Sequence, residues 1–249
     1  MNKRILAGVF ALLMAVSVLG ACRKKQETQP EIKVNVETPV KQKEVWHTEK
    51  EEGMSTYGYC VVDLDQDGKL EIMSAVNGGK YGDITKTRYY SIDEDTKMIS
   101  EITHTKGDSE ADVTYGVKNC YKNTETGQYF YIFYDRIQPS VAEKYERKVA
   151  VSLYGGEITE TILAEKAEIT DVNTEETTIT YKDADGNEIT EQDYRSIASK
   201  AFAGHELYQV DFAGFKGYDD AKNEQLKNIS DDELTELLRD SYSKFRIYQ

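Results

Sequence analysis

The chain has 249 residues, and its 45 acidic side chains outnumber its 31 lysines and arginines, which gives a formal net charge of −14 at pH 7. A surface this acidic repels phosphate backbones and anionic headgroups, which argues against nucleic acid as a partner, and it attracts divalent cations. The hydrophobic content of 39% is enough to build the core of one domain or of two small ones.

The first 22 residues have the pattern of an export signal. A basic start, Met1-Asn2-Lys3-Arg4, precedes an apolar stretch over residues 5–18 that is too short to span a bilayer comfortably. The stretch ends in Leu19-Gly20-Ala21-Cys22, which resembles the lipobox of bacterial lipoproteins. The resemblance implies that residues 1–21 are a signal peptide and that lipidation of Cys22 holds the protein on the extracytoplasmic face of a bacterial membrane. The alternative is an ordinary secretion signal in which this cysteine is incidental.

Residues 22–43 are polar and contain two of the three prolines, so we expect a flexible tether there. The remainder, residues 44–249, is predicted to form a single domain. It contains Cys60 and Cys120. An exported chain permits a disulfide between them, and the alternative is two small buried thiols in strands.

Paired β-runs separated by turn residues begin at residue 57 and predict a series of hairpins. The expected strand pairs are 57–62 with 70–76, 88–92 with 98–102, 119–122 with 128–134, 148–154 with 157–163, and 177–181 with 187–190. Because the strands of each pair are neighbours in the sequence, we expect an antiparallel β-meander sheet.

Two amphipathic helices are expected near the C-terminus, with a strand over residues 208–212 between them. Thr190 is placed to cap the first helix, and Gly204 is placed to end it. The second helix starts with Ser230 and Glu233, which have the spacing of a capping box. The predicted fold class is therefore α+β, an antiparallel meander sheet with two C-terminal amphipathic helices.

The segment over residues 63–71, DLDQDGKLE, carries the clearest chemistry. Carboxylates at alternate positions of a tight loop can turn toward one centre, and Gly68 supplies the positive φ that such a curl needs. Oxygen donors of this kind suit Ca²⁺, and there is no histidine or cysteine nearby that would favour zinc. The predicted metal ligands are Asp63, Asp65, Asp67, Lys69 through its carbonyl oxygen, and Glu71 directly or through a water molecule.

The loop starts like an EF-hand loop, but its twelfth position is Ser74, where that motif has a glutamate. It is more similar to the calcium loops of FG-GAP and integrin-type repeats, in which D-x-D-x-D-G-x-x-D/E lies between two strands. It also resembles the DxDxDGxxEL segment of exported lipoproteins from Firmicutes. Because this chain has a single such loop, the resemblance implies neither a propeller nor an adhesive function. The alternative is an acidic turn without a metal, which is also what we expect for residues 183–188.

Nothing in the sequence identifies a catalytic centre. The three histidines, His47, His104 and His205, lie outside any H-E-x-x-H motif, and neither a G-x-S-x-G elbow nor a phosphate-binding P-loop occurs. We therefore expect a monomeric calcium-binding surface protein that acts as a binding or interaction module for a cell-surface protein or glycan. The alternatives are a cell-envelope hydrolase and the solute-binding lipoprotein of a transporter, whose two lobes would need alternating strands and helices.

Overall fold

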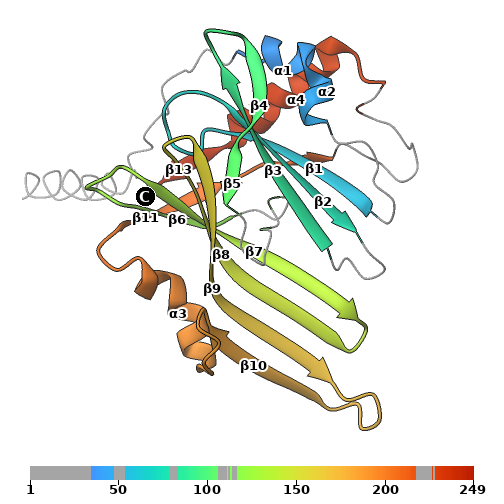
Figure 1. Ribbon diagram of the computed structural model, residues 1–249, viewed down its shortest axis with the longest axis vertical. Coiled ribbons are helices and arrows are strands. Elements are labelled where there is room, and N and C mark those ends of the chain that lie inside the picture. Colours follow the sequence, from blue (N-terminus) through green and yellow to red (C-terminus); the bar gives the residue numbers. More distant parts are fainter. Residues whose placement is uncertain are drawn as a thin grey trace, which may run out of the picture. The chain divides into compact units, whose positions relative to one another are not determined.

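Most of the described chain is extended, and its strands form two β-sheets (Figure 1). The computed structural model describes residues 35–47, 54–78, 84–105, 111, 113, 117–216, 226 and 228–249. All of them belong to one compact unit, Ile32–Gln249. The predicted signal peptide, Cys22 and the first part of the predicted tether lie outside the described residues.

The first sheet, sheet A, has the strand order β12-β1-β2-β3-β4, and all its described pairings are antiparallel. Its central hairpin is formed by β1 and β2, in which Val62 pairs with Glu71 at the end next to the acidic loop. The bounds are Met54–Val62 for β1, Glu71–Gly78 for β2, Ile84–Asp93 for β3, Met98–Glu101 for β4 and Phe215–Lys216 for β12.

The second sheet, sheet B, has the strand order β10-β9-β8-β7-β6-β11-β13, and the short strand β5 pairs with β9 in parallel. The other described pairings of this sheet are antiparallel. The bounds are Thr103–Thr105 for β5, Asn119–Lys122 for β6, Tyr129–Ser140 for β7, Glu143–Tyr154 for β8, Glu157–Thr170 for β9, Thr177–Asp183 for β10, Glu206–Asp211 for β11 and Arg246–Tyr248 for β13.

Alternation along β7 explains how sheet B is buried on both faces. Tyr131 and Phe133 point into the main core, which also contains Tyr59 and Tyr89 from sheet A. Ile132, one position out of phase, belongs to a second apolar cluster that includes residues of helix α3 (Glu191–Ala201). Burying a side chain of this size contributes about 1.5–3 kcal/mol each, so the shared core holds the two sheets together.

The other three helices pack on the side of sheet A. They are α1 (Glu37–Lys41), α2 (Lys43–Trp46) and α4 (Asp231–Lys244), and α4 lies along β1 and against α1. Trp46 is fully buried, donates its indole N–H to the carbonyl oxygen of Pro39 at 2.9 Å and meets the ring of Tyr59 edge-on. The folded body therefore begins before residue 44, because α1 lies in the range that the sequence assigns to the tether.

The structure is a mixture of α and β elements, as predicted, but the strands are divided between two sheets instead of one meander. Strand β6 lies beside β11, which is far from it in sequence. Strand β10 pairs along its whole length with β9, and only the bridge between Lys182 and Glu188 remains of the last predicted hairpin. These strand pairings depend on packing between distant segments, which local turn residues do not predict.

Two further features bear on the sequence predictions. Cys60 and Cys120 are buried thiols and not a disulfide, and Cys60 donates to the carbonyl oxygen of Val113 at 3.6 Å. Among the helices of the described residues, none combines the length and the apolar character that a membrane span requires.

Candidate metal centre

The loop over residues 63–70 joins β1 to β2, and its own carboxylates shape it. Asp65 Oδ1 accepts the backbone N–H of Asp67 at 3.2 Å, and Asp67 Oδ1 accepts that of Lys69 at 2.8 Å. Gly68 has a φ of 87° and donates its N–H to Asp63 Oδ2 at 3.1 Å. A side chain at that φ would be strained, so the glycine is what lets the chain turn back over Asp63.

Three carboxylates of the loop converge. Asp63, Asp65 and Glu71 each offer one oxygen, and these oxygens lie within 4.8 Å of one another. Because Ca²⁺ binds oxygen ligands at about 2.3–2.6 Å, two oxygens on one ion lie at most about 5 Å apart, so this spacing fits a shared ion. Asp63 and Glu71 are each only 3% exposed, and Asp65 is half-buried. This group could therefore hold a metal ion.

Only part of this negative charge is met by hydrogen bonds. Glu71 Oε2 accepts the backbone N–H of Leu64 at 2.7 Å, but Asp63 Oδ1 is buried and has no hydrogen-bond partner among the described residues. Burial, with a smaller contribution from the neighbouring carboxylates, raises the pKa of Asp63 to about 6 and that of Glu71 well above its usual value. A buried carboxylate oxygen of this kind needs a proton or a cation.

The two remaining predicted ligands face each other. The Lys69 ammonium lies 2.7 Å from Asp67 Oδ2, on the exposed side of the loop. Asp67 does not belong to the converging group, and its two oxygens accept hydrogen bonds from the Lys69 N–H and the Lys69 ammonium. Of the five predicted ligands, the structure brings together the side chains of Asp63, Asp65 and Glu71.

Residues from distant segments support the loop, and sequence reasoning missed them. The hydroxyl of Tyr131 on β7 donates to the carbonyl oxygen of Leu64 at 2.7 Å. On α4, Ser241 Oγ accepts the N–H of Val61 at 3.0 Å, and burial together with the charges of Asp63 and Glu71 raises the pKa of the next residue, Tyr242. In sequence, these tyrosines look like ordinary core positions of a strand and a helix, so no local signal identifies them.

The histidines form a buried pair and two aromatic contacts. His104 Nε2 lies 3.3 Å from Glu160 Oε1, and these side chains are 6% and 1% exposed. Glu160 also accepts the hydroxyl of Tyr89 at 2.8 Å, which joins the two sheets. His47 stacks on Tyr59 and His205 packs edge-on against Phe130. The burial of the His104–Glu160 pair favours a structural role.

The acidic turn predicted over residues 183–188 is a turn in the structure, and residues 93–96 form another. Asp183 Oδ1 accepts the N–H groups of Asp185 and Asn187 at 3.0 and 2.9 Å. Asp93 accepts the N–H groups of Asp95 and Thr96 in the same way. Asp93 is exposed and Asp183 is partly exposed. Hydrogen bonds from backbone N–H groups lower the pKa of Asp93, and hydrogen bonds from the Asn187 side chain and from the backbone lower that of Asp183. The pKa values of Asp63 and Glu71 in the acidic loop are shifted in the opposite direction.

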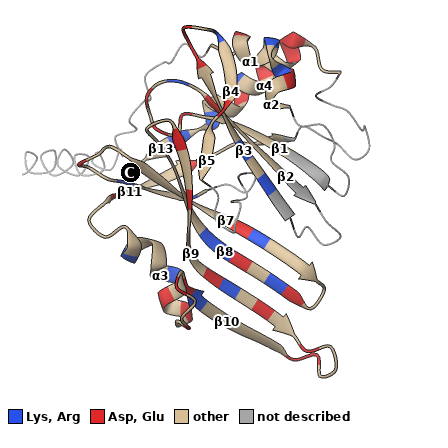
Figure 2. Ribbon diagram, viewed as in Figure 1, with Lys and Arg blue, Asp and Glu red and all other residues tan. Residues whose placement is uncertain are grey.

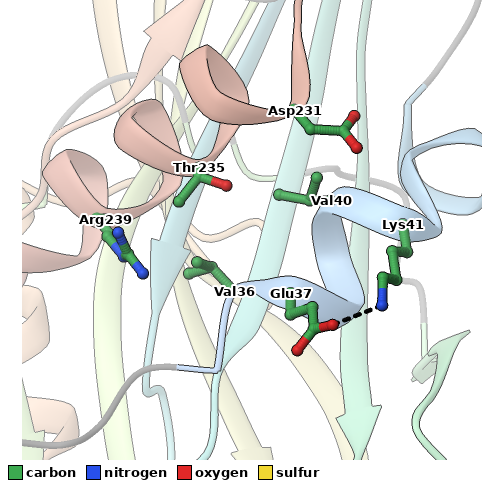
Figure 3. Close-up of a pocket in the computed structure, with 7 residues that line it drawn as sticks. All are labelled: Val36, Glu37, Val40, Lys41, Asp231, Thr235 and Arg239. Carbon is green, nitrogen blue, oxygen red and sulfur yellow. Dashed lines mark hydrogen bonds and ion pairs between the residues drawn. The ribbon is translucent and has the colours of Figure 1, made fainter.

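A pocket of about 200 Å³ lies between α1 and α4 (Figure 3). Its apolar part is formed by Val36 and Val40, and an ion pair between Glu37 and Lys41 lies at its edge. The remaining lining residues are Asp231, Thr235 and Arg239. Charges of both signs on an apolar floor do not specify a chemistry, and none of the three converging carboxylates lines this pocket.

No protein-family model, no curated protein and no solved structure matches this chain.

Proposed function

We propose that the loop over residues 63–71 binds one calcium ion, and that the protein is a lipid-anchored extracytoplasmic surface protein in which this ion is structural. The observation that carries the calcium proposal is the convergence of Asp63, Asp65 and Glu71, together with a buried oxygen of Asp63 that has no hydrogen-bond partner among the described residues. A divalent cation would neutralise charges that hydrogen bonds leave uncompensated.

Calcium fits this donor set better than the other common ions. All the donors are oxygens, whereas structural zinc sites use cysteine and histidine. Calcium accepts six to eight oxygens in a flexible geometry, so water molecules and backbone carbonyls can complete the sphere. We propose that, when the ion binds, the Asp67 carboxylate breaks its ion pair with the Lys69 ammonium and coordinates the ion. The Lys69 carbonyl oxygen would then become a ligand as well.

Thermal melting of the purified protein tests the metal proposal. At a dissociation constant of about 10⁻⁴ to 10⁻³ M, 10 mM calcium should stabilise the fold by about 1.4–2.7 kcal/mol, which corresponds to a rise in Tm of roughly 3–10 °C over the value in a chelator. Asp65→Ala should lose this rise. Asp185→Ala, which changes an exposed turn aspartate, should keep it. Equal melting temperatures in calcium and chelator for the unchanged protein would refute the proposal.

The anchoring proposal is supported by the lipobox-like segment ending at Cys22. In the producing bacterium, Cys22→Ser should prevent lipidation and release the protein from the membrane fraction. A Cys22→Ser protein that still partitions with membranes would contradict the anchor.

We propose a cell-surface protein or glycan as the partner of the monomeric module. The two mainly antiparallel sheets differ from the lobes of alternating strands and helices expected of a transporter's solute-binding lipoprotein. The His104–Glu160 pair, which a hydrolase would need at a surface, is buried. A pull-down with envelope glycans and surface proteins of the same bacterium tests the binding role. Hydrolysis of an envelope substrate by the purified protein would instead support the hydrolase alternative.

A further inference from the structure

Two buried polar atoms without hydrogen-bond partners among the described residues belong to the same region of the molecule. One is Asp63 Oδ1, directly after β1, and the other is the hydroxyl of Tyr242 on α4. Asp63 is 3% exposed and Tyr242 is 7% exposed. Buried polar groups in folded proteins almost always have partners, so these two atoms indicate that a further polar group belongs in this part of the core.

Helix α4 packs along β1, the strand that leads into the acidic loop. The neighbouring Ser241 accepts the N–H of Val61 at 3.0 Å and donates to the carbonyl oxygen of Ala213 at 2.6 Å. These hydrogen bonds hold α4 against β1 at Val61, which lies two residues before Asp63. Burial, and then the charges of Asp63 and Glu71, raise the pKa of Tyr242 to about 12.

No hydrogen bond joins the Tyr242 hydroxyl to either carboxylate. A group that is close enough to sense a charge but too far to bond it directly is commonly connected through a water molecule. Calcium usually keeps some water among its ligands. A phenylalanine would fill the same apolar position on α4 without burying a hydroxyl, so the hydroxyl itself needs a reason.

We propose that Tyr242 is a positioning residue of the ion site, whose hydroxyl donates a hydrogen bond to a water molecule bound to the ion and thereby makes the C-terminal helix α4 part of the site. This inference rests on the proposed function of the loop as a calcium site. It adds that ion binding tightens the contact between α4 and β1, and that the helix in turn raises the affinity for the ion, since such coupling is reciprocal.

The test compares Tyr242→Phe with the unchanged protein by calorimetric titration with calcium chloride. Loss of the hydroxyl should weaken calcium binding roughly tenfold, as is typical for groups that support metal ligands. The melting temperature of the metal-free Tyr242→Phe protein should be equal or higher, because an unpartnered hydroxyl has been removed from the core. Tyr194→Phe, on helix α3 against sheet B, is the matched control and should bind calcium unchanged.

Hydrogen exchange supplies a readout that a purely structural role of Tyr242 would not change. Calcium should increase the protection of the amides over residues 238–244 in the unchanged protein, and Tyr242→Phe should lose most of this increase. Calcium binding by Tyr242→Phe with unchanged affinity would overturn the inference and leave the calcium site itself intact. If the unchanged protein binds no calcium, the proposed function and this inference both fail, whereas failure of the inference alone appears only in the Tyr242→Phe comparison.

Discussion

Asp63 is the residue at which sequence and structure agree most closely. Its spacing from Asp65 and Glu71, together with the positive φ of Gly68, was sufficient to predict that these carboxylates converge. The sequence did not reveal that the Lys69 ammonium holds Asp67 on the exposed side. Competition between an ion and a lysine for one carboxylate depends on side-chain placement, which residue spacing does not determine.

The metal-free protein should lose stability as the pH rises, because the pKa of Asp63 is about 6 in the folded protein and 3.8 in the reference state. The folded form then binds more protons than the unfolded form between about pH 4 and pH 6, so the free energy of unfolding falls across this window by roughly 3 kcal/mol at most from this group. The raised pKa of Glu71 acts in the same direction.

Asp63→Asn isolates the Asp63 contribution. In buffers stripped of metal, urea denaturation should show Asp63→Asn to be more stable than the unchanged protein at pH 7.5 and nearly equal to it at pH 4.5. With 10 mM calcium at pH 7.5 the order should reverse, because the variant has lost a ligand. Parallel pH profiles for the two proteins without metal would show that the charge on Asp63 is not destabilising.

At the scale of elements, local patterns predicted where strands and helices form better than which elements pair. The capping box of Ser230 and Glu233 is present at the start of α4, and alternation located most of the strands. Helix α1 was not predicted, because it has only five residues and few local helix signals. Its stability depends on the packing of Val36 and Val40 in the core.

Rows of alternating charge cross sheet B and align its strands (Figure 2). On one face, Asp135, Arg147, Glu165 and Lys182 stand in register across β7, β8, β9 and β10. Opposite charges in such cross-strand pairs favour one register over a shifted one. The neighbouring row, on the other face, includes Arg136 paired with Glu146 and Lys166 beyond it, again with alternating sign.

Two arginines from these rows make a matched pair for mutation. Arg147 is 21% exposed, lies 2.8 Å from Glu165 and 3.7 Å from Asp135, and Asp135 is 2% exposed. Arg147→Met should therefore destabilise the fold by about 2 kcal/mol or more. Arg136→Met removes a 3.1 Å pair whose arginine is 51% exposed and should cost less than about 1 kcal/mol. Equal losses in urea denaturation would show that burial does not govern this network.

At the scale of the whole molecule, the acidic loop lies where several elements meet. It connects the two strands of a hairpin of sheet A, Tyr131 hydrogen-bonds it from sheet B, and α4 packs on β1, the strand that leads into it. The division into two sheets was not predictable from the sequence, because it is decided by contacts such as that of Tyr89 with Glu160, whose partners lie 71 residues apart. An ion in this loop would stabilise both sheets and the helix together.

Calorimetric titration of the purified, metal-free protein with calcium chloride tests the central claim most directly. We predict one ion per chain, with a dissociation constant of about 10⁻⁴ to 10⁻³ M. The absence of any saturable calcium binding at millimolar concentrations would contradict the account and leave the loop as an acidic turn.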